Sequence, residues 1–96
     1  MFNGDLNKVA AYCEEIGAEY NIVEMAGTKF LYVHDKTEFR KRLEAVGKDQ
    51  LLYVGYLRLS KHEDHDYLYG RYNGWCQYYS DKQVKEIIDD LTKGAA

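Results

Sequence analysis

Apolar residues recur at helical spacing close to both ends of the chain. The first stripe spans residues 5–16 and consists of Leu6, Val9, Ala10, Cys13 and Ile16. This spacing places the apolar side chains on one side of an α-helix. Gly17 follows and is a residue at which helices often end. We predict an amphipathic helix here, with Cys13 as a small core residue.

The last stripe of the chain consists of Val84, Ile87, Ile88 and Leu91. Ser80 and Gln83 lie three residues apart just before it, which is the spacing of a capping box. Gly94 follows the stripe and is expected to end the helix.

A further helix is predicted after residue 34, where Asp35 can act as N-cap and Glu38 follows three residues later. Its apolar stripe consists of Phe39, Leu43 and Val46. The side chains of Arg40, Lys41 and Arg42 lie largely away from that stripe. This helix should therefore present a basic face.

Strand patterns occupy the rest of the chain. Residues 19–25 and 29–34 are β-prone and are separated by a short turn at Ala26-Gly27-Thr28. Residues 50–60 alternate between two faces, with Leu57 and Leu59 on one and Arg58 and Ser60 on the other. The pattern predicts an antiparallel pair followed, after the basic helix, by a long strand.

The strongest local signal is a hairpin formed by residues 67–72 and 75–79 around Asn73-Gly74, the preferred pair for a two-residue turn. This turn predicts that Tyr72 faces Trp75, that Gly70 faces Gln77 and that Leu68 faces Tyr79. One hairpin face then carries Leu68, Tyr72, Trp75 and Tyr79, and the other carries Tyr67, Tyr69, Arg71, Cys76 and Tyr78. Leu68 and Trp75 favour the first face as the core side, which leaves the second face as the exposed one.

The predicted order is α-β-β-α-β-β-β-α. Short turns between strands favour antiparallel pairing, with the helices packed mainly on one face of the sheet. We predict an α+β fold for residues 1–96, built as a single domain with about five antiparallel strands and three helices.

The composition changes this picture in two respects. The 96 residues include 10 Tyr, which favours strands and interfaces, and the formal net charge is −3, which opposes general phosphate binding. No apolar stretch is long enough to cross a bilayer, and the two cysteines lack paired spacing. We therefore expect a cytoplasmic protein without disulfides or a membrane contact.

The exposed hairpin face is the candidate binding surface, because tyrosine and arginine are enriched at binding hot spots. Exposed rings are also compatible with self-association in a homodimer, or with plain exposure on a strand. The candidate residues, which include neighbouring residues of the long strand and the acids of the loop before the hairpin, are Tyr56, Arg58, Glu63, Asp64, Asp66, Tyr67, Tyr69, Arg71 and Tyr78.

Two sets of residues could carry chemistry. His62 and His65 lie among three acids in the loop, yet their spacing matches no established metal site, so we expect a solvated acidic loop and no cofactor. His34-Asp35 could serve acid–base work, but a strand-end histidine beside a helix cap explains the pair equally well. Without a marked nucleophile or a phosphate-binding loop, nothing indicates an enzyme.

The leading hypothesis is a small non-enzymatic binding protein with a protein partner. In size, acidity and tyrosine content the chain resembles small phage-encoded inhibitors, including anti-CRISPR proteins. This resemblance implies non-catalytic inhibition, either by mimicking nucleic acid or by blocking a protein surface. One alternative is a nucleic-acid-binding module that uses the basic face formed by Arg40, Lys41 and Arg42. Another is a domain that binds a small molecule or a metal.

Overall fold

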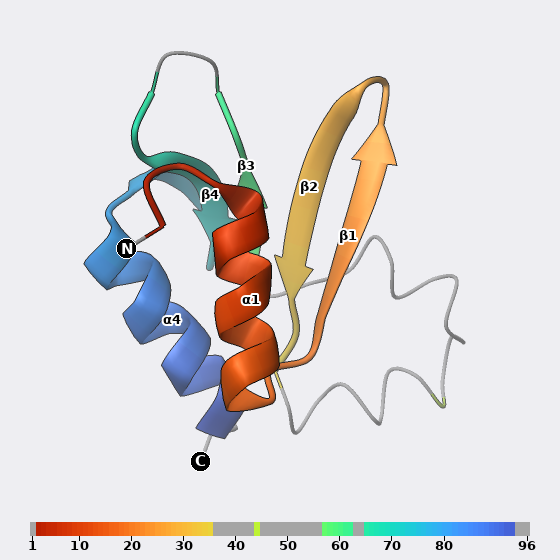
Figure 1. Ribbon diagram of the computed structural model, residues 1–96, viewed down its shortest axis with the longest axis vertical. Coiled ribbons are helices and arrows are strands. Elements are labelled where there is room, and N and C mark those ends of the chain that lie inside the picture. Colours follow the sequence, from red (N-terminus) through yellow and green to blue (C-terminus); the bar gives the residue numbers. More distant parts are fainter. Residues whose placement is uncertain (1, 36–43, 45–56, 63–64, 94–96) are drawn as a thin grey trace.

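The computed structural model describes residues 2–35, 44, 57–62 and 65–93 (Figure 1). The elements, in chain order, are α1 (Leu6–Ile16), β1 (Tyr20–Met25), β2 (Thr28–Val33), β3 (Leu57–Ser60), β4 (Leu68–Tyr72), β5 (Trp75–Tyr79) and α4 (Asp81–Lys93). The five strands pair with their sequence neighbours in one antiparallel sheet of order β1-β2-β3-β4-β5.

This arrangement confirms the predicted α+β class and the five-stranded antiparallel sheet. Within the described ranges the order is α-β-β-β-β-β-α, with two helices instead of three. The predicted basic helix after Asp35 lies outside the described residues, as does most of the predicted strand 50–60. Over the described part of that strand the alternation is as expected, because Leu57 and Leu59 are fully buried on the core side.

Two tight turns set the register of the two hairpins. Asn73 and Gly74 have φ values of 51° and 80°, and Ala26 and Gly27 have 51° and 79°. Positive φ at both central residues is what a type I′ turn requires, and its twist matches that of the flanking strands. The predicted pairings of Tyr72 with Trp75, of Gly70 with Gln77 and of Leu68 with Tyr79 are confirmed.

The helix ends also follow local chemistry. The Asp5 carboxylate accepts the Asn7 N–H at 2.9 Å at the start of α1, and Gly17 ends α1 in the left-handed conformation. At the start of α4, the Ser80 N–H donates to the Gln83 side chain at 2.9 Å, and the Gln83 N–H donates to the Ser80 hydroxyl at 3.2 Å. The capping box is therefore reciprocal, as predicted.

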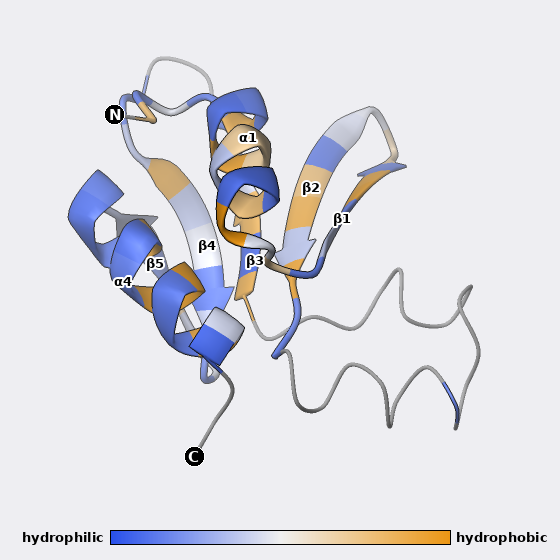
Figure 2. Cartoon of the chain, turned by 60° about the horizontal axis from the view of Figure 1, so that its bottom comes forward, coloured by the Kyte–Doolittle hydropathy of each residue, from blue (hydrophilic) through white to orange (hydrophobic). Residues whose placement is uncertain are grey.

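Both helices cover the same face of the sheet (Figures 1 and 2). Figure 2 shows apolar segments on β2, β3 and α4, and these meet in one core. The core residues are Phe2, Leu6, Val9, Cys13, Leu31, Val33, Leu57, Leu59, Leu68, Tyr79, Val84, Ile88 and Leu91. Cys13 is fully buried, as predicted, and burial raises the pKa of its thiol to about 12.

Gly70 allows close packing in the middle of this core. A Cβ atom at Gly70 would lie 2.9 Å from a Leu59 side-chain carbon and 2.9 Å from a ring carbon of Tyr79. The missing side chain therefore lets the Tyr79 ring lie over the strand, with its hydroxyl donating to the Trp75 carbonyl at 3.1 Å. This contact explains a glycine inside a strand, where it is otherwise unfavourable.

Polar contacts join the N-terminal segment and α1 to α4. The Tyr12 hydroxyl donates to the Asp89 carboxylate, which also accepts from Lys85 at 3.0 Å. The hydrogen bond from Tyr12, aided by Lys85, lowers the pKa of Asp89 against the opposing effect of burial. The Phe2 N–H donates to Asp81 at 2.9 Å. Charge-assisted bonds thus join the edges of the two apolar stripes.

The prediction that Trp75 belongs to the core was wrong. Trp75 lies on the helix-covered face as the register requires, but it is 74% exposed and does not belong to the core. Trp75 follows the turn on an edge strand, so neighbouring strands flank it on one side alone. Leu68 and Tyr79, farther from the turn, are buried on that face.

Neither described helix is long and apolar enough to cross a membrane.

Candidate functional site

The candidate site is the face of the sheet opposite α1 and α4, here called the open face. Strand register places two rows of side chains across it. The first row is Val23, Phe30, Ser60, Tyr69 and Tyr78, and the second is Asn21, Tyr32, Arg58, Arg71 and Cys76. Arg71, Cys76 and Tyr78 are exposed, whereas Tyr32 and Ser60 are buried near the middle of the sheet.

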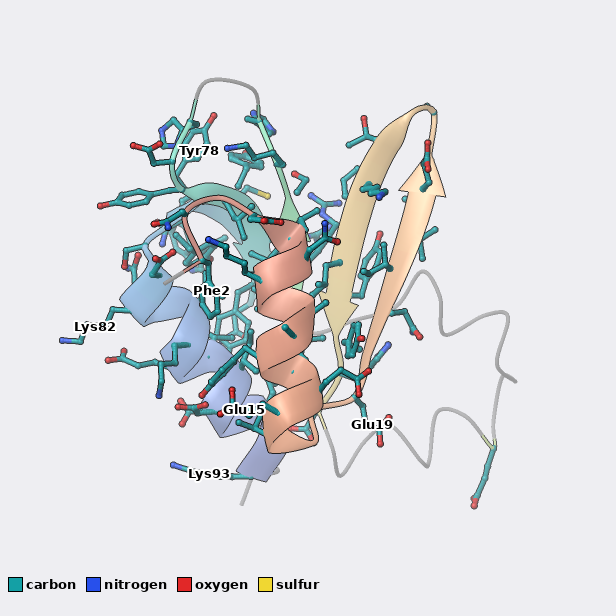
Figure 3. All side chains as sticks on the ribbon, viewed as in Figure 1. Phe2, Glu15, Glu19, Tyr78, Lys82 and Lys93 are labelled. Carbon is teal, nitrogen blue, oxygen red and sulfur yellow. The ribbon has the colours of Figure 1, made fainter. Side chains whose placement is uncertain are left out.

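Aromatic rings gather where the loop before β4 meets β4 and β5. The Tyr69 and Tyr78 rings are cross-strand neighbours with centroids 5.2 Å apart in an edge-to-face arrangement. His62 stacks on Tyr69 at 4.8 Å, and His65 stacks on Tyr78 at 3.7 Å. Together with Tyr67, these five residues form what we call the tyrosine–histidine cluster, and Figure 3 shows Tyr78 at this end of the sheet.

Hydrogen bonds order the cluster further. The Tyr78 hydroxyl lies 3.1 Å from His62 Nδ1, and the Tyr67 N–H donates to His65 Nδ1 at 3.1 Å. His65 Nδ1 also lies 3.3 Å from the Tyr67 carbonyl oxygen, so both backbone polar groups of Tyr67 lie next to this ring nitrogen. The loop histidines are therefore packing partners of the tyrosines, which the sequence did not indicate.

The tyrosine–histidine cluster remains accessible at its rim. Tyr67 is 48% exposed and Tyr78 is 38% exposed, while Tyr69 between them is half-buried. No group of three His, Cys, Asp or Glu side chains suited to a metal occurs in the part of the chain that the structure describes. The rings of His62 and His65, the weak metal candidates, take part in stacking. The loop acids Glu63 and Asp64 lie outside the described residues.

Two arginines lie side by side next to the cluster. Arg58 of β3 and Arg71 of β4 are direct cross-strand neighbours on the open face. The Arg58 guanidinium lies 5.6 Å from the centroid of the Phe30 ring. Like charges directly opposite each other in a sheet are destabilising. Within the described ranges, neither guanidinium forms a salt bridge with a carboxylate.

The described strands place no acidic side chain on the open face. None of the twelve positions that the described strands place on it is Asp or Glu, although the chain carries 16 acidic residues. The acid of the sheet, Glu24, pairs with Lys29 on the other face. The open face is therefore a basic and aromatic surface on an acidic chain.

Most of the described candidate residues lie on or beside this surface. Arg58, Tyr69, Arg71 and Tyr78 share the open face, Tyr67 adjoins it, and Asp66 is exposed in the loop. Sequence reasoning missed Phe30 and Tyr32 as parts of the site, although the two-residue turn at Ala26-Gly27 could have placed them on one face. It placed Cys76 on the exposed hairpin face but did not count it among the candidate residues. The candidates Tyr56, Arg40, Lys41 and Arg42 lie outside the described residues.

Two other parts of the molecule bring polar groups together. His34 and Asp35 are each 2% exposed, and His34 Nε2 lies 2.8 Å from the Asn21 amide nitrogen, so neither residue presents an accessible acid–base group. A pocket at the start of α1 is lined by Asn3 to Asn7 with Lys29 and Lys61. Its helix end is capped by Asp5, and Lys61 donates to the His65 carbonyl.

In comparisons with known proteins, no family model, no curated protein and no solved structure matches the chain. The interpretation of the open face therefore depends on its chemistry.

Proposed function

We propose that this chain is a small non-enzymatic binding protein whose open face binds an acidic segment of a protein partner. The observation that carries the proposal is the pairing of Arg58 with Arg71 on a face whose described strand positions include no acid. Two adjacent guanidinium groups attract carboxylates, which they can bind in bidentate fashion. An acidic side chain from a partner would relieve their mutual repulsion.

The rings around the two arginines supply the apolar part of such an interface. Phe30 and Tyr69 lie beside the arginine pair, and Tyr78 lies at the accessible end of the cluster. Tyr and Arg dominate binding hot spots because they combine a large contact area with directed hydrogen bonds. The Tyr78 ring stacks on His65 and meets His62 edge-to-face, and this prior ordering of the rings lowers the entropy cost of binding.

The loop next to the cluster adds charge of the opposite sign. Asp66 is exposed, and Glu63 and Asp64 precede it in the sequence. A partner that offers acids to the arginine pair and bases to the loop would be held in one orientation, since charge patterns set register and association rate. Such one-sided, non-catalytic binding is how a phage-type inhibitor would block a surface.

Site-specific photo-crosslinking tests the proposal. A photoreactive amino acid at position 67, which is exposed beside the open face, should capture one partner from a lysate, whereas the same group at position 82 should capture none. Lys82 is exposed on α4, away from the open face (Figure 3). Arg71→Glu should lower the capture by about tenfold or more through charge reversal, while Lys82→Glu should leave it unchanged. Capture that is insensitive to Arg71→Glu would refute the proposed surface.

Single-stranded nucleic acid is the second candidate ligand, because arginines among aromatic rings on a sheet also suit phosphates and stacked bases. With its arginine pair, the open face is a second possible nucleic-acid-binding surface, in addition to the basic residues Arg40, Lys41 and Arg42. The net charge of −3 opposes it. Fluorescence anisotropy with single-stranded oligonucleotides distinguishes the two, since tight binding with a steep salt dependence would favour nucleic acid.

A further inference from the structure

The β5 strand ends the sheet with unpaired backbone groups. In a two-residue hairpin the residues beside the turn form a hydrogen-bonded pair, and such pairs alternate with non-hydrogen-bonded ones. Tyr72 and Trp75 flank the turn, so the N–H and C=O groups of Cys76 and Tyr78 point away from β4. No hydrogen bond from elsewhere in the described ranges reaches these four groups.

This edge carries none of the usual protection against pairing with another strand. Natural edges are guarded by charged side chains, by proline or by bulges. The sequence of β5 is Trp-Cys-Gln-Tyr-Tyr, without a charge or a proline, and its first four residues are exposed. Its pairing with β4 is regular from end to end, so no bulge turns the strand away.

The opposite edge of the sheet differs. The β1 strand carries the exposed Glu24, and the exposed Glu19 directly precedes it. Charged side chains of this kind protect natural sheet edges against pairing with another strand. A contrast of this kind within one sheet favours β5 as the edge that pairs.

We infer that β5 pairs antiparallel with the β5 strand of a second copy of this chain, which joins two sheets into one. The second copy is the occupant favoured by charge, because an uncharged strand meets no repulsion from itself. A two-fold axis also makes the contact self-complementary, so one strand satisfies the other with the same residues. This inference goes beyond the proposed function, since it concerns the backbone edge of β5 and not the side chains of the open face.

Geometry selects the register of the pairing. Residues whose backbone N–H and C=O groups point away from β4 must lie opposite residues of the same kind in the second copy. A two-fold axis through Gln77 meets this condition, because it pairs Cys76 with the partner's Tyr78, and Tyr78 with the partner's Cys76. The two hydrogen-bonded pairs exchange two backbone bonds each. An axis at Cys76 or at Tyr78 would instead pair one of these residues with a position outside the strand. The chosen register also sets the exposed Trp75 opposite the partner's Tyr79.

The dimer would extend the open face. Cys76 and Tyr78 lie on that face in each copy, so the rows of the two open faces would continue across the junction. The two Cys76 residues would be diagonal neighbours with Cα atoms about 8 Å apart. That separation is too long for a direct disulfide and suits a short bifunctional thiol reagent. Cys13 would not compete because it is buried.

Light scattering after size exclusion tests the inference on the full chain. The expected mass is twice the 11.2 kDa of one chain. Gln77→Lys places two ammonium groups opposite each other at the axis and should weaken the dimer by about tenfold or more. Ile22→Lys adds the same charge at the β1 edge, where Ile22 is 41% exposed, and should leave the mass unchanged.

Two further readouts report on the register. A bis-maleimide of short span should link two wild-type chains through Cys76, and Cys76→Ser should abolish the link. Amide hydrogen exchange at Cys76 and Tyr78 should slow as protein concentration rises. A monomeric mass at high concentration, or a dimer that Gln77→Lys does not weaken, would overturn the inference. Capture of a partner by a monomeric Gln77→Lys chain would show that the proposed function stands independently of the dimer.

Discussion

The two faces of the sheet use the same strands for different purposes. On the covered face, Leu31, Leu57 and Leu59 are fully removed from solvent beneath α1 and α4. On the open face, their immediate sequence neighbours include Tyr32 and Arg58, which lie among other aromatic and basic side chains. Because alternate residues of a strand point to opposite faces, a single segment can supply both a core and a surface. Stability and recognition should therefore be separable by mutation.

The largest expected effect is on the covered face. Leu59 is fully buried and lies between Leu31 and Gly70 in neighbouring strands. Leu59→Ala should lower the free energy of unfolding by about 2–5 kcal/mol, because it removes apolar contacts and leaves a cavity. Urea titration followed by circular dichroism measures this loss. A change below about 1 kcal/mol would mean that the site collapses around the smaller residue.

The open face should tolerate a larger change at lower cost. The double variant Tyr69→Ser/Tyr78→Ser removes an edge-to-face ring pair whose value is about 0.5–1.5 kcal/mol, and its rings are only partly buried. We expect a loss of about 1 kcal/mol, together with a clear loss of partner capture. The same urea titration compares it with Leu59→Ala. A loss as large as that of Leu59→Ala would show that the two faces are not separable.

The smallest effect is expected where the edges of the two helices meet. Asp89→Asn weakens the bonds to Tyr12 and Lys85, which are partly exposed, so the loss at neutral pH should stay below about 1 kcal/mol. A small loss would indicate that the packing of the covered face is stabilised by burial of apolar side chains and not by these charged contacts.

The pH dependence of that effect follows from the pKa of Asp89. The folded-state pKa is lowered by the bond from Tyr12, so the folded protein holds the proton less tightly than the unfolded chain does. The stabilisation is thus complete above the ordinary aspartate pKa of about 3.9 and is lost as the pH falls through the lower folded value. Wild type and Asp89→Asn should converge in stability as the pH falls below the ordinary aspartate pKa of about 3.9 and through the lower folded value. A gap that widens on acidification would contradict this sign.

Local features of the fold could be predicted because their causes are local. The Asn73-Gly74 turn sets the register of its hairpin, since both residues adopt the positive φ that only a few residue types tolerate. The reciprocal bonds between Ser80 and Gln83 start α4 within four residues of sequence. Periodicity then identified Cys13 as a buried residue of α1. Each of these predictions depends on neighbours in sequence alone.

The composition of the open face depended on long-range pairing. Sequence alone determined that Tyr69, Arg71 and Tyr78 share a hairpin face, because a two-residue turn leaves one register. Only the tertiary structure decided that Phe30 lies beside Arg58, that His62 and His65 stack on the tyrosines, and that Trp75 is exposed. These outcomes depend on which strand becomes the neighbour of which and where the sheet ends. Such choices arise from the packing of distant segments, which turn chemistry and periodicity do not encode.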